Sequence, residues 1–576
     1  MMLTDCLGRG SGAKQSRELT RRKDGVWWRR QQWIPGVVVL AVVVGFFFLV
    51  NWWMFSRLQY DPSAHREDLG HVLNSALPGN QINHARIGGH HQVMNTRLLA
   101  LAAHALADAE EKPEPDELWK ETLAAIFTWK PCADRRSWMP GDGTNGYILV
   151  SANGGISQQR VAICNAVAIA RLLNSTLVLP KFLYSNVWQD SSQFSDIYEE
   201  EHFVNYLKAD IKIVKELPAE LQSLDLEARG IIITDAEIRK EEKPSFYVKK
   251  ILPILLKKKV VHFSGFGNHL AFDPIPFDLQ RLRCRCNFHA LRFVKKIQET
   301  GALLIRRMRQ PRSHPNPLVY NLVGSFAVSP NINKKSTLPS LASRYLAVHL
   351  RYEIEMAAYS LCYFGGGKEE VEELEAYRQI HFPVLTALRK TTKMPSPNVL
   401  RSEGQCPFTP EEAILLLVAL GFKRKTRIYV AGAHIYGGRS RMAILKSLYP
   451  YLVTKDDLLS PSELEPFRNF SSQQAALDFI VCAAADTFAM TDSGSQLSSL
   501  VAGYRVYYGG GRHPTILPNK RRLAGIFARN STIEWKQFEA RVLEAIKQSK
   551  VVQERPIARS VYRHPRCLEC MCSANL

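Results

Sequence analysis

YILVSANGGISQQRVAICNAVAIARLLNSTLVLP, residues 147–180, places a long apolar segment between two short runs of β-prone residues. The runs at 147–152 and 175–180 have the length of buried strands, whereas 161–173 has the length and composition of a helix. GGISQQR, between the first strand and the helix, is expected to form a loop. This order predicts a βαβ unit, in which parallel strands bind ligands at their carboxyl ends.

Strand and helix patterns continue to alternate beyond this unit. Strands are predicted at 230–237 and 259–266, and a helix over 285–301 that ends at Gly301. A Pro- and Asn-rich stretch at 310–335 then divides this series from a second one. The first series therefore predicts one Rossmann-like domain.

The second series begins with a strand at 345–351. Further elements are predicted at 369–390, 409–421 and 440–450 as helices, at 426–432 as a strand, and at 486–508 as a strand followed by a helix. Thr409 followed by Glu411 and Glu412 is typical of a helix start. We therefore expect two Rossmann-like domains, 144–335 and 336–545, that face each other across a cleft, which is the GT-B arrangement.

The N-terminal region has the pattern of a membrane anchor. Residues 33–55 contain no charged residue, are long enough to cross a bilayer as one helix, and have tryptophans near both ends. Residues 1–32 are rich in Arg and Lys, so the positive-inside rule keeps them in the cytosol. A cleavable signal peptide is the alternative, but its apolar region is usually shorter and small residues follow it. We expect a type II membrane protein with a stem at 56–143 and a Cys-containing tail at 546–576.

Length and charge limit the classes of function. A chain of 576 residues is too long for one core, so two or three domains are expected. The net charge of +21 could attract nucleic acid, but the basic N-terminal run lies directly before the apolar segment, and no nucleic-acid partner is expected. A single predicted span argues against a transporter or a channel.

A lumenal location also fits the glycosylation sequons and the cysteines. Acceptor sites for N-glycosylation occur at Asn174, Asn469 and Asn530. An oxidising compartment allows the 11 cysteines to pair, and the C-terminal thiols lack an obvious fourth zinc ligand. The cysteines that we expect in disulfides on this basis are Cys284, Cys286, Cys567, Cys570 and Cys572.

Two polar residues follow the strand that opens the second series. His349 and Arg351 come directly after the apolar run 345–348, at the edge where a ligand is expected. A planar guanidinium can donate two charge-assisted hydrogen bonds to a diphosphate. The competing interpretation is structural, with Arg351 paired to Glu353 or Glu355 and His349 as a satisfied core histidine. The pattern alone leaves both open.

Two strand-to-helix segments are further candidates for anion binding. In GGISQQR, Gly154 and Gly155 let the backbone approach a ligand, and the helix N-terminus and Arg160 favour negative charge. In TDSGSQLSS, residues 491–499, Ser495 and local amides could bind a phosphate, although a plain N-cap has equal weight. No Asp-x-Asp pair is present to hold a metal ion and a diphosphate. Protein side chains would then have to meet the charge of a leaving diphosphate.

Six blocks of the chain together resemble a known family. GYILVSANGGISQQRVAICNAVAIARLLNSTLVLP, RCNFHALRF, HLRYEIEMAAYSLC, RSEGQCPFTPEE, IYVAGAHIYGG and SGSQLSSLVAGYRVYYGG, in order from Asn145 to Phe527, resemble the plant O-fucosyltransferase-like family. The resemblance implies an inverting, metal-independent GT-B enzyme of the Golgi that transfers fucose from GDP-fucose to a glycan or protein acceptor, without a cofactor. A UDP-rhamnose-dependent rhamnosyltransferase of pectin synthesis and a catalytically silent glycan-binding member are the alternatives.

The resemblance also implies roles for individual residues. Arg351, in a His-Leu-Arg motif with His349, would contact the donor diphosphate and assist departure of the nucleotide as the catalytic residue. The remaining implied donor contacts are Gly154, Gly155, Arg160, Asp486, Ser495 and Gln496, and the implied disulfide pair is Cys362 with Cys406. Asp486 could accept hydrogen bonds from N1 and N2 of guanine. Two positions depart from the family pattern. Ser157 stands where many relatives have Asn, and Gly154 stands where one animal branch has a Glu that acts as the catalytic base. The catalytic base of this chain is therefore unassigned.

Overall fold

The computed structural model of the chain describes residues 94–121, 129–136, 138, 144–184, 190–222, 231–309, 316–328, 344–432, 434–492, 494–510, 512–547 and 554–573. The chain divides into two units, residues 1–90 and 91–576, and the described residues all belong to the second. The basic tail at 1–32 and the predicted span at 33–55 lie outside the described residues. No helix in the described part of the chain is both long enough and apolar enough to cross a membrane.

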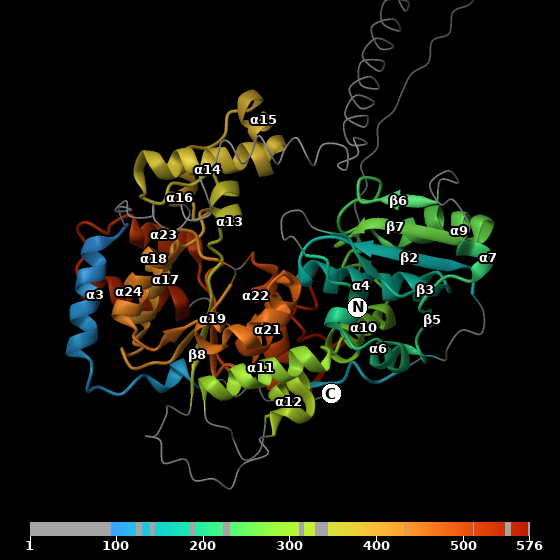
Figure 1. Cartoon of the computed structure of the whole chain (residues 1–576), viewed down its shortest axis with the longest axis horizontal. Helices are drawn as coiled ribbons and strands as arrows, with labels where there is room; N and C mark the ends of the chain where they lie inside the picture. The colour runs from blue at the N-terminus through green and yellow to red at the C-terminus, as the bar shows by residue number, and fades with distance from the viewer. Residues whose placement is uncertain are drawn as a thin grey trace, which may run out of the picture. The chain divides into compact units, whose positions relative to one another are not determined.

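The first half of the second unit is built on a six-stranded parallel sheet (Figure 1). The strand order is β5-β3-β2-β7-β6, and β4 pairs with β2. The bounds are β2 Tyr147–Ala152, β3 Thr176–Val178, β4 Lys181–Phe182, β5 Ile213–Val214, β6 Ile232–Thr234 and β7 Val260–Phe266. This confirms the predicted βαβ unit and the strands predicted at 230–237 and 259–266.

Helix α4 (Ile156–Leu172) joins β2 to β3 and begins before the predicted start at residue 161. Gly155 is its N-cap, and the Gly155 N–H donates to Gln158 Oε1 at 3.1 Å. Gly154 has a φ of 78°, and a Cβ there would overlap the Gln158 side chain. GGISQQR is therefore the start of the helix rather than a loop, and its glycines allow the tight entry from β2.

Helices surround this sheet, and the one predicted over 285–301 is broken. Residues 291–294 are extended and bond to the segment 197–199, through Glu199 N–H to Arg292 O at 3.0 Å and Val294 N–H to Ile197 O at 3.0 Å. The helices of this half are α5 Phe194–Ile197, α6 Glu200–Leu207, α7 Ala219–Gln222, α8 Pro244–Phe246, η3 Tyr247–Ile251, α9 Leu252–Lys258, α10 Phe277–Arg285, η4 Cys286–Ala290, α11 Lys295–Met308, α12 Pro317–Val323 and η5 Gly324–Ala327. Gly301 lies inside α11 and does not end it, contrary to the prediction.

The second half contains a five-stranded parallel sheet in the order β10-β9-β8-β11-β12. The bounds are β8 Leu346–His349, β9 Ile428–Ala431, β10 Leu452–Val453, β11 Thr487–Met490 and β12 Thr515–Ile516. β8 is the central strand, and its residues are buried. The strands predicted at 345–351 and 426–432 are confirmed, so the fold is α/β with two parallel sheets.

Helix α17 (Pro410–Leu420) begins where the sequence predicts it. Thr409 Oγ1 accepts from the Glu412 N–H at 3.2 Å, and Glu412 accepts in return from the Thr409 N–H at 2.9 Å. The helix ends at Gly421, whose φ is 95°. All eleven of its residues are buried, so α17 is a central helix of this half.

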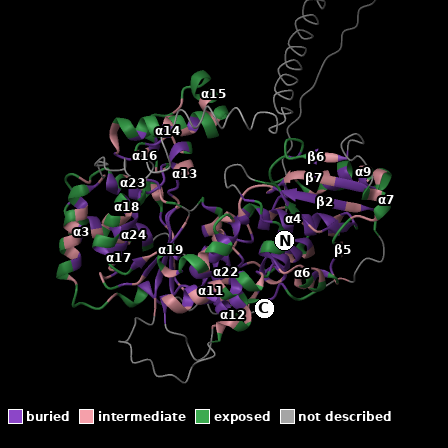
Figure 2. Ribbon diagram, viewed as in Figure 1, coloured by how far each residue is buried: buried purple, intermediate pink, exposed green. Residues whose placement is uncertain are grey.

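The helix predicted over 369–390 is two helices, α14 (Gly367–His381) and α15 (Pro383–Thr391). Pro383 lacks an N–H and cannot continue a helix, so α14 ends before it. The other helices of this half are α13 Ile354–Tyr359, α16 Pro397–Ser402, α18 Gly438–Leu448, α19 Lys455–Leu458, α20 Pro461–Leu464, η6 Glu465–Phe467, α21 Ser471–Ala484, α22 Gln496–Gly509, α23 Lys520–Phe527 and α24 Trp535–Lys547. Figure 2 shows that α14 and α15 are largely exposed, whereas the strands and the helices around them are buried.

The predicted stem and tail are parts of the fold where the structure describes them. Helix α3 (Thr96–Asp108) buries Leu98, Ala102 and Leu106 in the core that α17 and α24 share, and η1 (Asp116–Leu118) follows it. Strand β13 (Met571–Ser573) pairs antiparallel with β1 (Trp129–Pro131). The stem interpretation is thus wrong for α3, because its apolar face packs into the second half.

The two halves share a hydrophobic core. Buried residues of α4, α11, α21 and α22 belong to one cluster, together with Tyr345 and Ala347 of the second sheet. Gly301 of α11 allows the close approach of α21, since a Cβ there would lie 2.8 Å from Ile480 Cδ1. Helices α21 and α22 both contact α4, and α21 also contacts β8, so they connect the two sheets.

Candidate active site

A cavity of about 530 Å³ is lined by residues from both halves. Its walls come from the N-terminus of α4, the segment after β8, the residue after β9, the start of α21 and the turn between β11 and α22. The carboxyl ends of β8, β9 and β11 thus meet at this cavity, where parallel sheets bind their ligands. Its volume lies within the range of small-molecule sites.

His349 ends β8 and contacts the beginning of α22. Its Nδ1 lies 2.7 Å from Ser498 Oγ and 3.4 Å from Ser495 Oγ. Burial, with a smaller contribution from Arg351, lowers the pKa of His349 to about 3. The imidazole is therefore neutral at physiological pH, and it orients the turn before α22 rather than supplying positive charge.

Arg351 is fixed at its backbone and at its guanidinium. Its N–H donates to Thr491 Oγ1 at 3.0 Å, and Thr491 Oγ1 donates to His349 O at 3.0 Å, which joins the end of β8 to the end of β11. Its Nη1 donates to Glu353 Oε2 at 2.9 Å. The Arg351 side chain is 22% exposed and that of Glu353 is 5% exposed. Arg351 is thus ion-paired with Glu353, as the structural interpretation expects, and it also lines the cavity, whereas diphosphate binding by Arg351 stays a prediction.

The N-terminus of α4 forms another part of the cavity wall, through Gly155, Ile156, Ser157 and Gln158. The first N–H groups of a helix lack intrahelical partners and carry partial positive charge. The hydroxyl of Ser157 is buried and makes no hydrogen bond within the described structure. Free amide dipoles together with an unpaired hydroxyl suit an anionic ligand.

Arg160 does not reach the cavity, which corrects the prediction that it binds an anion. Its side chain is buried, with Nε donating to Asn287 Oδ1 at 2.8 Å and Nη2 donating to the carbonyls of Asn287 and Leu291. It also packs over the rings of Tyr198 and Phe293. Arg160 therefore holds α4 against η4 and the extended segment that follows it.

Asp486 lies at the wrong end of its strand for the predicted contact with guanine. It precedes β11, whereas the cavity is at the carboxyl end of that strand. Its Oδ1 accepts from Arg309 Nη1 at 3.1 Å, and its Oδ2 accepts from the Tyr345 N–H at 2.9 Å. Asp486 is thus a structural ion-pair partner at the opposite edge of the sheet.

The turn after β11 brings other predicted residues to the cavity. Ser495 and Gln496 both line it, and Ser495 caps α22 by accepting from the Ser498 N–H at 3.3 Å. Asp492, the second residue after β11, also lines the cavity and accepts from Lys520 Nζ at 3.2 Å. The structure therefore places an acidic group near the cavity at Asp492 rather than at Asp486.

A buried ion pair that the sequence analysis missed lies in the cavity wall. Lys455 Nζ donates to Asp478 Oδ2 at 3.3 Å and to Gly432 O at 3.0 Å. Asp478 also accepts from Tyr429 Oη at 2.6 Å and from the Gly432 N–H at 3.2 Å. A single Asp within the apolar sequence of α21 was the available signal, since a buried carboxylate needs partners.

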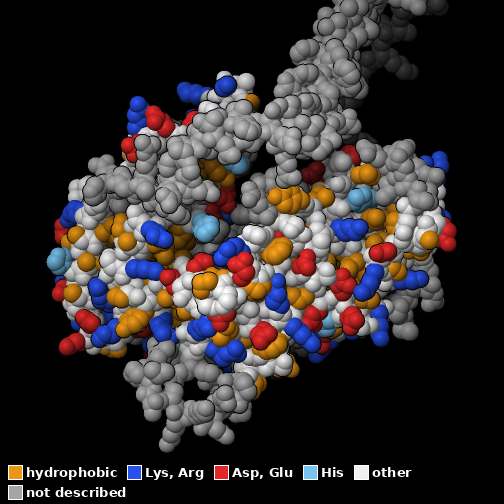
Figure 3. All heavy atoms as spheres, viewed as in Figure 1, with side chains coloured by type: hydrophobic (Ala, Val, Ile, Leu, Met, Phe, Trp, Pro, Cys, Tyr) orange, Lys and Arg blue, Asp and Glu red, His pale blue; other side chains and the backbone are white. Residues whose placement is uncertain are grey.

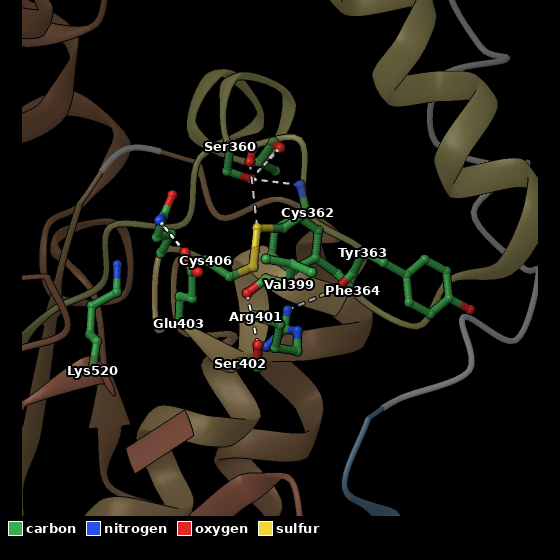
Figure 4. Close-up of a disulfide and its surroundings, with 12 residues drawn as sticks. Ser360, Cys362, Tyr363, Phe364, Val399, Arg401, Ser402, Glu403, Cys406 and Lys520 are labelled. Atoms are coloured by element: carbon green, nitrogen blue, oxygen red, sulfur yellow. Dashed lines mark hydrogen bonds between the residues drawn. A yellow bond between two sulfur atoms is a disulfide. The ribbon is translucent and has the colours of Figure 1, made fainter. Parts of the chain in front are cut away.

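Disulfides hold several segments around these elements. Cys362 is bonded to Cys406, with a Cα–Cα distance of 5.8 Å, and the bond joins the turn after α13 to the segment after α16 (Figure 4). Cys132–Cys572 and Cys284–Cys570 attach the C-terminal segment to the first half. Cys286 and Cys567 are free thiols, which corrects the expectation that they are paired. Cys284 takes Cys570 as its partner, and Cys286 instead contacts the buried thiol of Cys164.

The glycosylation candidates differ in their surroundings. Asn174 and Asn469 are exposed. The Asn530 side chain donates from Nδ2 to Asn95 Oδ1 at 2.7 Å, and glycosylation would attach to that same nitrogen. Asn174 and Asn469 are therefore the more accessible sites.

Metal binding and surface charge add little to this site. No group of three or more His, Cys, Asp or Glu residues that could hold a metal ion occurs within the described ranges. The face in Figure 3 carries Lys and Arg side chains interspersed with Asp and Glu.

Comparison with known proteins gives agreement over most of the chain. Residues 147–508 match the model of the GDP-fucose protein O-fucosyltransferase family. O-fucosyltransferase 15 of Arabidopsis thaliana is 59% identical over 558 residues, covering 93% of this chain and 86% of that relative. O-fucosyltransferase 2 of Arabidopsis thaliana is 55% identical over 576 residues, covering 97% and 92%. Among solved structures, POFUT1 in complex with GDP-fucose matches with a TM-score of 0.33 and 16% identity, over 65% of this chain and 99% of that one.

Proposed function

The chain belongs to the GDP-fucose protein O-fucosyltransferase family, and from this premise we propose that it transfers fucose from GDP-fucose to a hydroxyl of a glycan or protein acceptor. It is a glycosyltransferase of the O-fucosyltransferase kind. The observation that carries the proposal is the position of Arg351, whose anchored guanidinium lines the cavity to which the α4 N-terminus also contributes. Two groups that favour anions thus surround one space.

The proposed chemistry is departure of GDP with inversion at the sugar carbon. As the bond between the sugar and the β-phosphate breaks, negative charge grows on the diphosphate. Arg351 and the amides at the start of α4 are preorganised to donate hydrogen bonds to that charge. The acceptor hydroxyl attacks the opposite face of the sugar and loses its proton. His349 is neutral and orients the turn before α22, so it adds no charge to the diphosphate site.

Preference for guanine over uracil can be tested by ligand-dependent stability. At equal concentration, a ligand that binds only the folded state raises the melting temperature more the more tightly it binds. We expect GDP to protect the full-length protein more than UDP at equal concentration. Stronger protection by UDP would favour a rhamnosyltransferase, and no protection by either nucleotide would favour a silent glycan-binding protein.

We propose that the reaction needs no divalent cation. Support comes from the guanidinium and helix amides at the cavity, which can neutralise a diphosphate without a metal ion. Addition of a chelator should leave turnover unchanged. Loss of turnover that manganese restores would contradict this part of the proposal.

We propose further that the protein is a type II membrane protein of the Golgi with its catalytic part in the lumen. The uncharged segment at 33–55 and the basic residues before it support this topology. The disulfides are typical of an oxidising compartment. Protease added to sealed microsomes should leave the catalytic part intact, and its digestion would contradict the topology.

A further inference from the structure

Glu353 is a buried acid in the cavity wall, and its side chain does not cap the helix that it begins. It occupies the N-cap position of α13, yet its carboxylate makes no capping hydrogen bond. The residue is 4% exposed, and its Oε2 accepts from Arg351 Nη1 at 2.9 Å. Carboxylates are rarely buried to this extent unless they are paired. Arg351 is thus the ion-pair partner of Glu353, and its charge favours the ionised form of the carboxylate.

The backbone holds Glu353 in place whatever Arg351 does. Its carbonyl accepts from the Ala357 N–H at 3.0 Å, and the residue forms an isolated antiparallel bridge with Ile435. Its Oε1 lies over Gly432, where an added Cβ would be only 3.9 Å away. If the guanidinium turns toward a ligand, the carboxylate therefore stays behind in the wall.

We propose that Glu353 is the counter-ion of Arg351, and that binding of a donor diphosphate at Arg351 is coupled to the uptake of one proton by Glu353. The inference rests on the proposed function only in requiring a diphosphate at Arg351. The diphosphate competes for the guanidinium and adds negative charge beside a buried carboxylate. A buried carboxylate with a weakened partner takes up a proton rather than remain charged.

The surroundings of Glu353 favour this response. Burial raises the pKa of Glu353 above its ordinary value even in the paired state, Arg351 opposes the rise, and Glu355 on the same helix adds to it. An anion at Arg351 pushes the pKa in the same direction as burial and Glu355 do.

Other charged groups of the wall already have partners or cannot take the proton at physiological pH. Lys455 is paired with Asp478, and Asp492 is paired with Lys520. His349, which is buried beside Arg351, stays neutral because its pKa is about 3. Glu353 is therefore the group that we expect to bind the proton.

Proton uptake would make Arg351 a stronger hydrogen-bond donor to the leaving group. With Glu353 neutral, the full charge of the guanidinium is available to the diphosphate, where negative charge grows in the transition state. When the nucleotide leaves, the carboxylate ionises again and recaptures Arg351. Glu353 is thus a positioning residue that acts through Arg351.

Calorimetric titration in two buffers of different ionisation enthalpy measures the proton directly. GDP-fucose is the ligand of choice, because its phosphates are esterified and carry no proton that titrates near neutral pH. We expect the full-length wild type to take up as much as one proton per bound GDP-fucose, and to bind about 3-fold more tightly in mildly acid buffer than at neutral pH. Glu353→Gln should abolish the uptake and the pH dependence, with equal or tighter binding at pH 7.

Glu372→Gln is the matched control, because Glu372 is exposed on α14 and, among the described residues, forms an ion pair only with Lys368 at the surface. It should behave as the wild type does. If Glu353→Gln does not fold, Glu353→Asp keeps a carboxylate at a longer distance from Arg351 and should retain uptake at a shifted pH. Wild-type binding without proton uptake, or equal uptake by the wild type and Glu353→Gln, would overturn the inference alone.

The outcomes separate this inference from the proposed function. If GDP-fucose does not bind but GDP or UDP does, the proposed donor is wrong. Proton uptake by the wild type is then compared with uptake by Glu353→Gln for that nucleotide. Protons that bind to or leave the terminal phosphate of the nucleotide contribute equally to both proteins, so the difference between them reports on Glu353. If no nucleoside diphosphate binds, both proposals are overturned together.

Discussion

Arg351 is anchored before any ligand arrives, through the Thr491 hydroxyl at its backbone and the Glu353 carboxylate at its guanidinium. Once a bound diphosphate has drawn the guanidinium away from Glu353, the anchored backbone keeps this charged donor in place as charge develops in the reaction. The same contacts explain why Arg351 serves both stability and function. A change at Arg351 should therefore separate the two.

Arg351→Lys keeps the charge but loses the planar fork of donors. We expect turnover of GDP-fucose to fall by about 100-fold or more, within the range for loss of a preorganised donor. The melting temperature should change little, because Lys can still pair with Glu353. Steady-state kinetics and a thermal melt of the same preparation check this. An unfolded variant would show that the role of Arg351 is structural.

Ser157→Ala tests the N-terminus of α4. The hydroxyl has no protein partner in the described structure, so its removal should not lower stability. If it donates to the donor phosphates, GDP-fucose binding should weaken by about 10-fold, since a hydrogen bond to a charged group contributes about 1.5 kcal/mol or more. Ser447→Ala is the control, because Ser447 is exposed on α18 and its hydroxyl donates to Ile444 O of the same helix, its one partner in the part of the chain that the structure describes. Unchanged affinity in Ser157→Ala would remove this residue from the site.

Strand ends explain which site residues the sequence could predict. His349 ends β8, Arg351 follows it, and Ser495 and Gln496 follow β11. All four lie at the carboxyl ends of parallel strands, where the sequence rule expects a ligand. Gly155 lies there as well, and Gly154 is adjacent to it. The predictions for Arg160 and Asp486 were wrong for two different reasons. The direction of the Arg160 side chain depends on the rotation of α4 about its axis, and Asp486 lies at the amino end of β11 rather than at its carboxyl end.

At the scale of elements, the contact between α11 and α21 depends on the absence of a side chain at Gly301. Gly301→Ala should destabilise the protein by about 1–3 kcal/mol, because the added Cβ would lie 2.8 Å from Ile480 Cδ1 in a packed core. Gly525→Ala is the opposite control. Gly525 lies inside α23, and no described atom beyond its chain neighbours and its own helix backbone lies within 4 Å of the new Cβ. Ala at this position should therefore raise the free energy of unfolding by about 0.5–1 kcal/mol. Denaturant unfolding measures the free energy of unfolding of both variants. Equal changes in Gly301→Ala and Gly525→Ala would contradict the close contact between α11 and α21.

Hydrogen bonds to segments distant in sequence determine some of the helix boundaries that hydrophobic periodicity could not predict. The predicted βαβ unit and α17 were right, because local signals such as Thr409, Glu412 and Gly421 agree with the packing. The break at 291–294 arises from hydrogen bonds to 197–199, which no local pattern reveals. The start of α4 depends on the Gln158 side chain, and α14 ends early because of Pro383.

At the scale of the molecule, a side chain of the first half caps a helix of the second half beside the cavity. Asp190 of the first half accepts from the Ser472 N–H at the start of α21, and from the Ser192 N–H at 2.8 Å. Burial raises the pKa of Asp190, but the hydrogen bonds from Ser472 and Ser192 outweigh it and lower the pKa below its ordinary value. The carboxylate is therefore the form that the folded state prefers.

Asp190→Asn should destabilise the protein by about 1 kcal/mol at neutral pH, as expected for loss of a charged cap. A lowered pKa contributes stability that is present above the ordinary Asp value and is lost as the pH falls through the folded value. The difference between wild type and variant should thus shrink below about pH 3.8. Denaturant unfolding at neutral and acid pH checks the sign. A difference that persists in acid would contradict a role for the ionised carboxylate.

Release of nucleotide from sugar nucleotides by the purified full-length protein tests the central claim most directly. The assay compares GDP-fucose with UDP-rhamnose in the presence of a chelator. The account predicts that GDP-fucose is turned over without added metal and that UDP-rhamnose is not. Turnover of UDP-rhamnose in place of GDP-fucose, or of neither donor with any acceptor supplied, would contradict it.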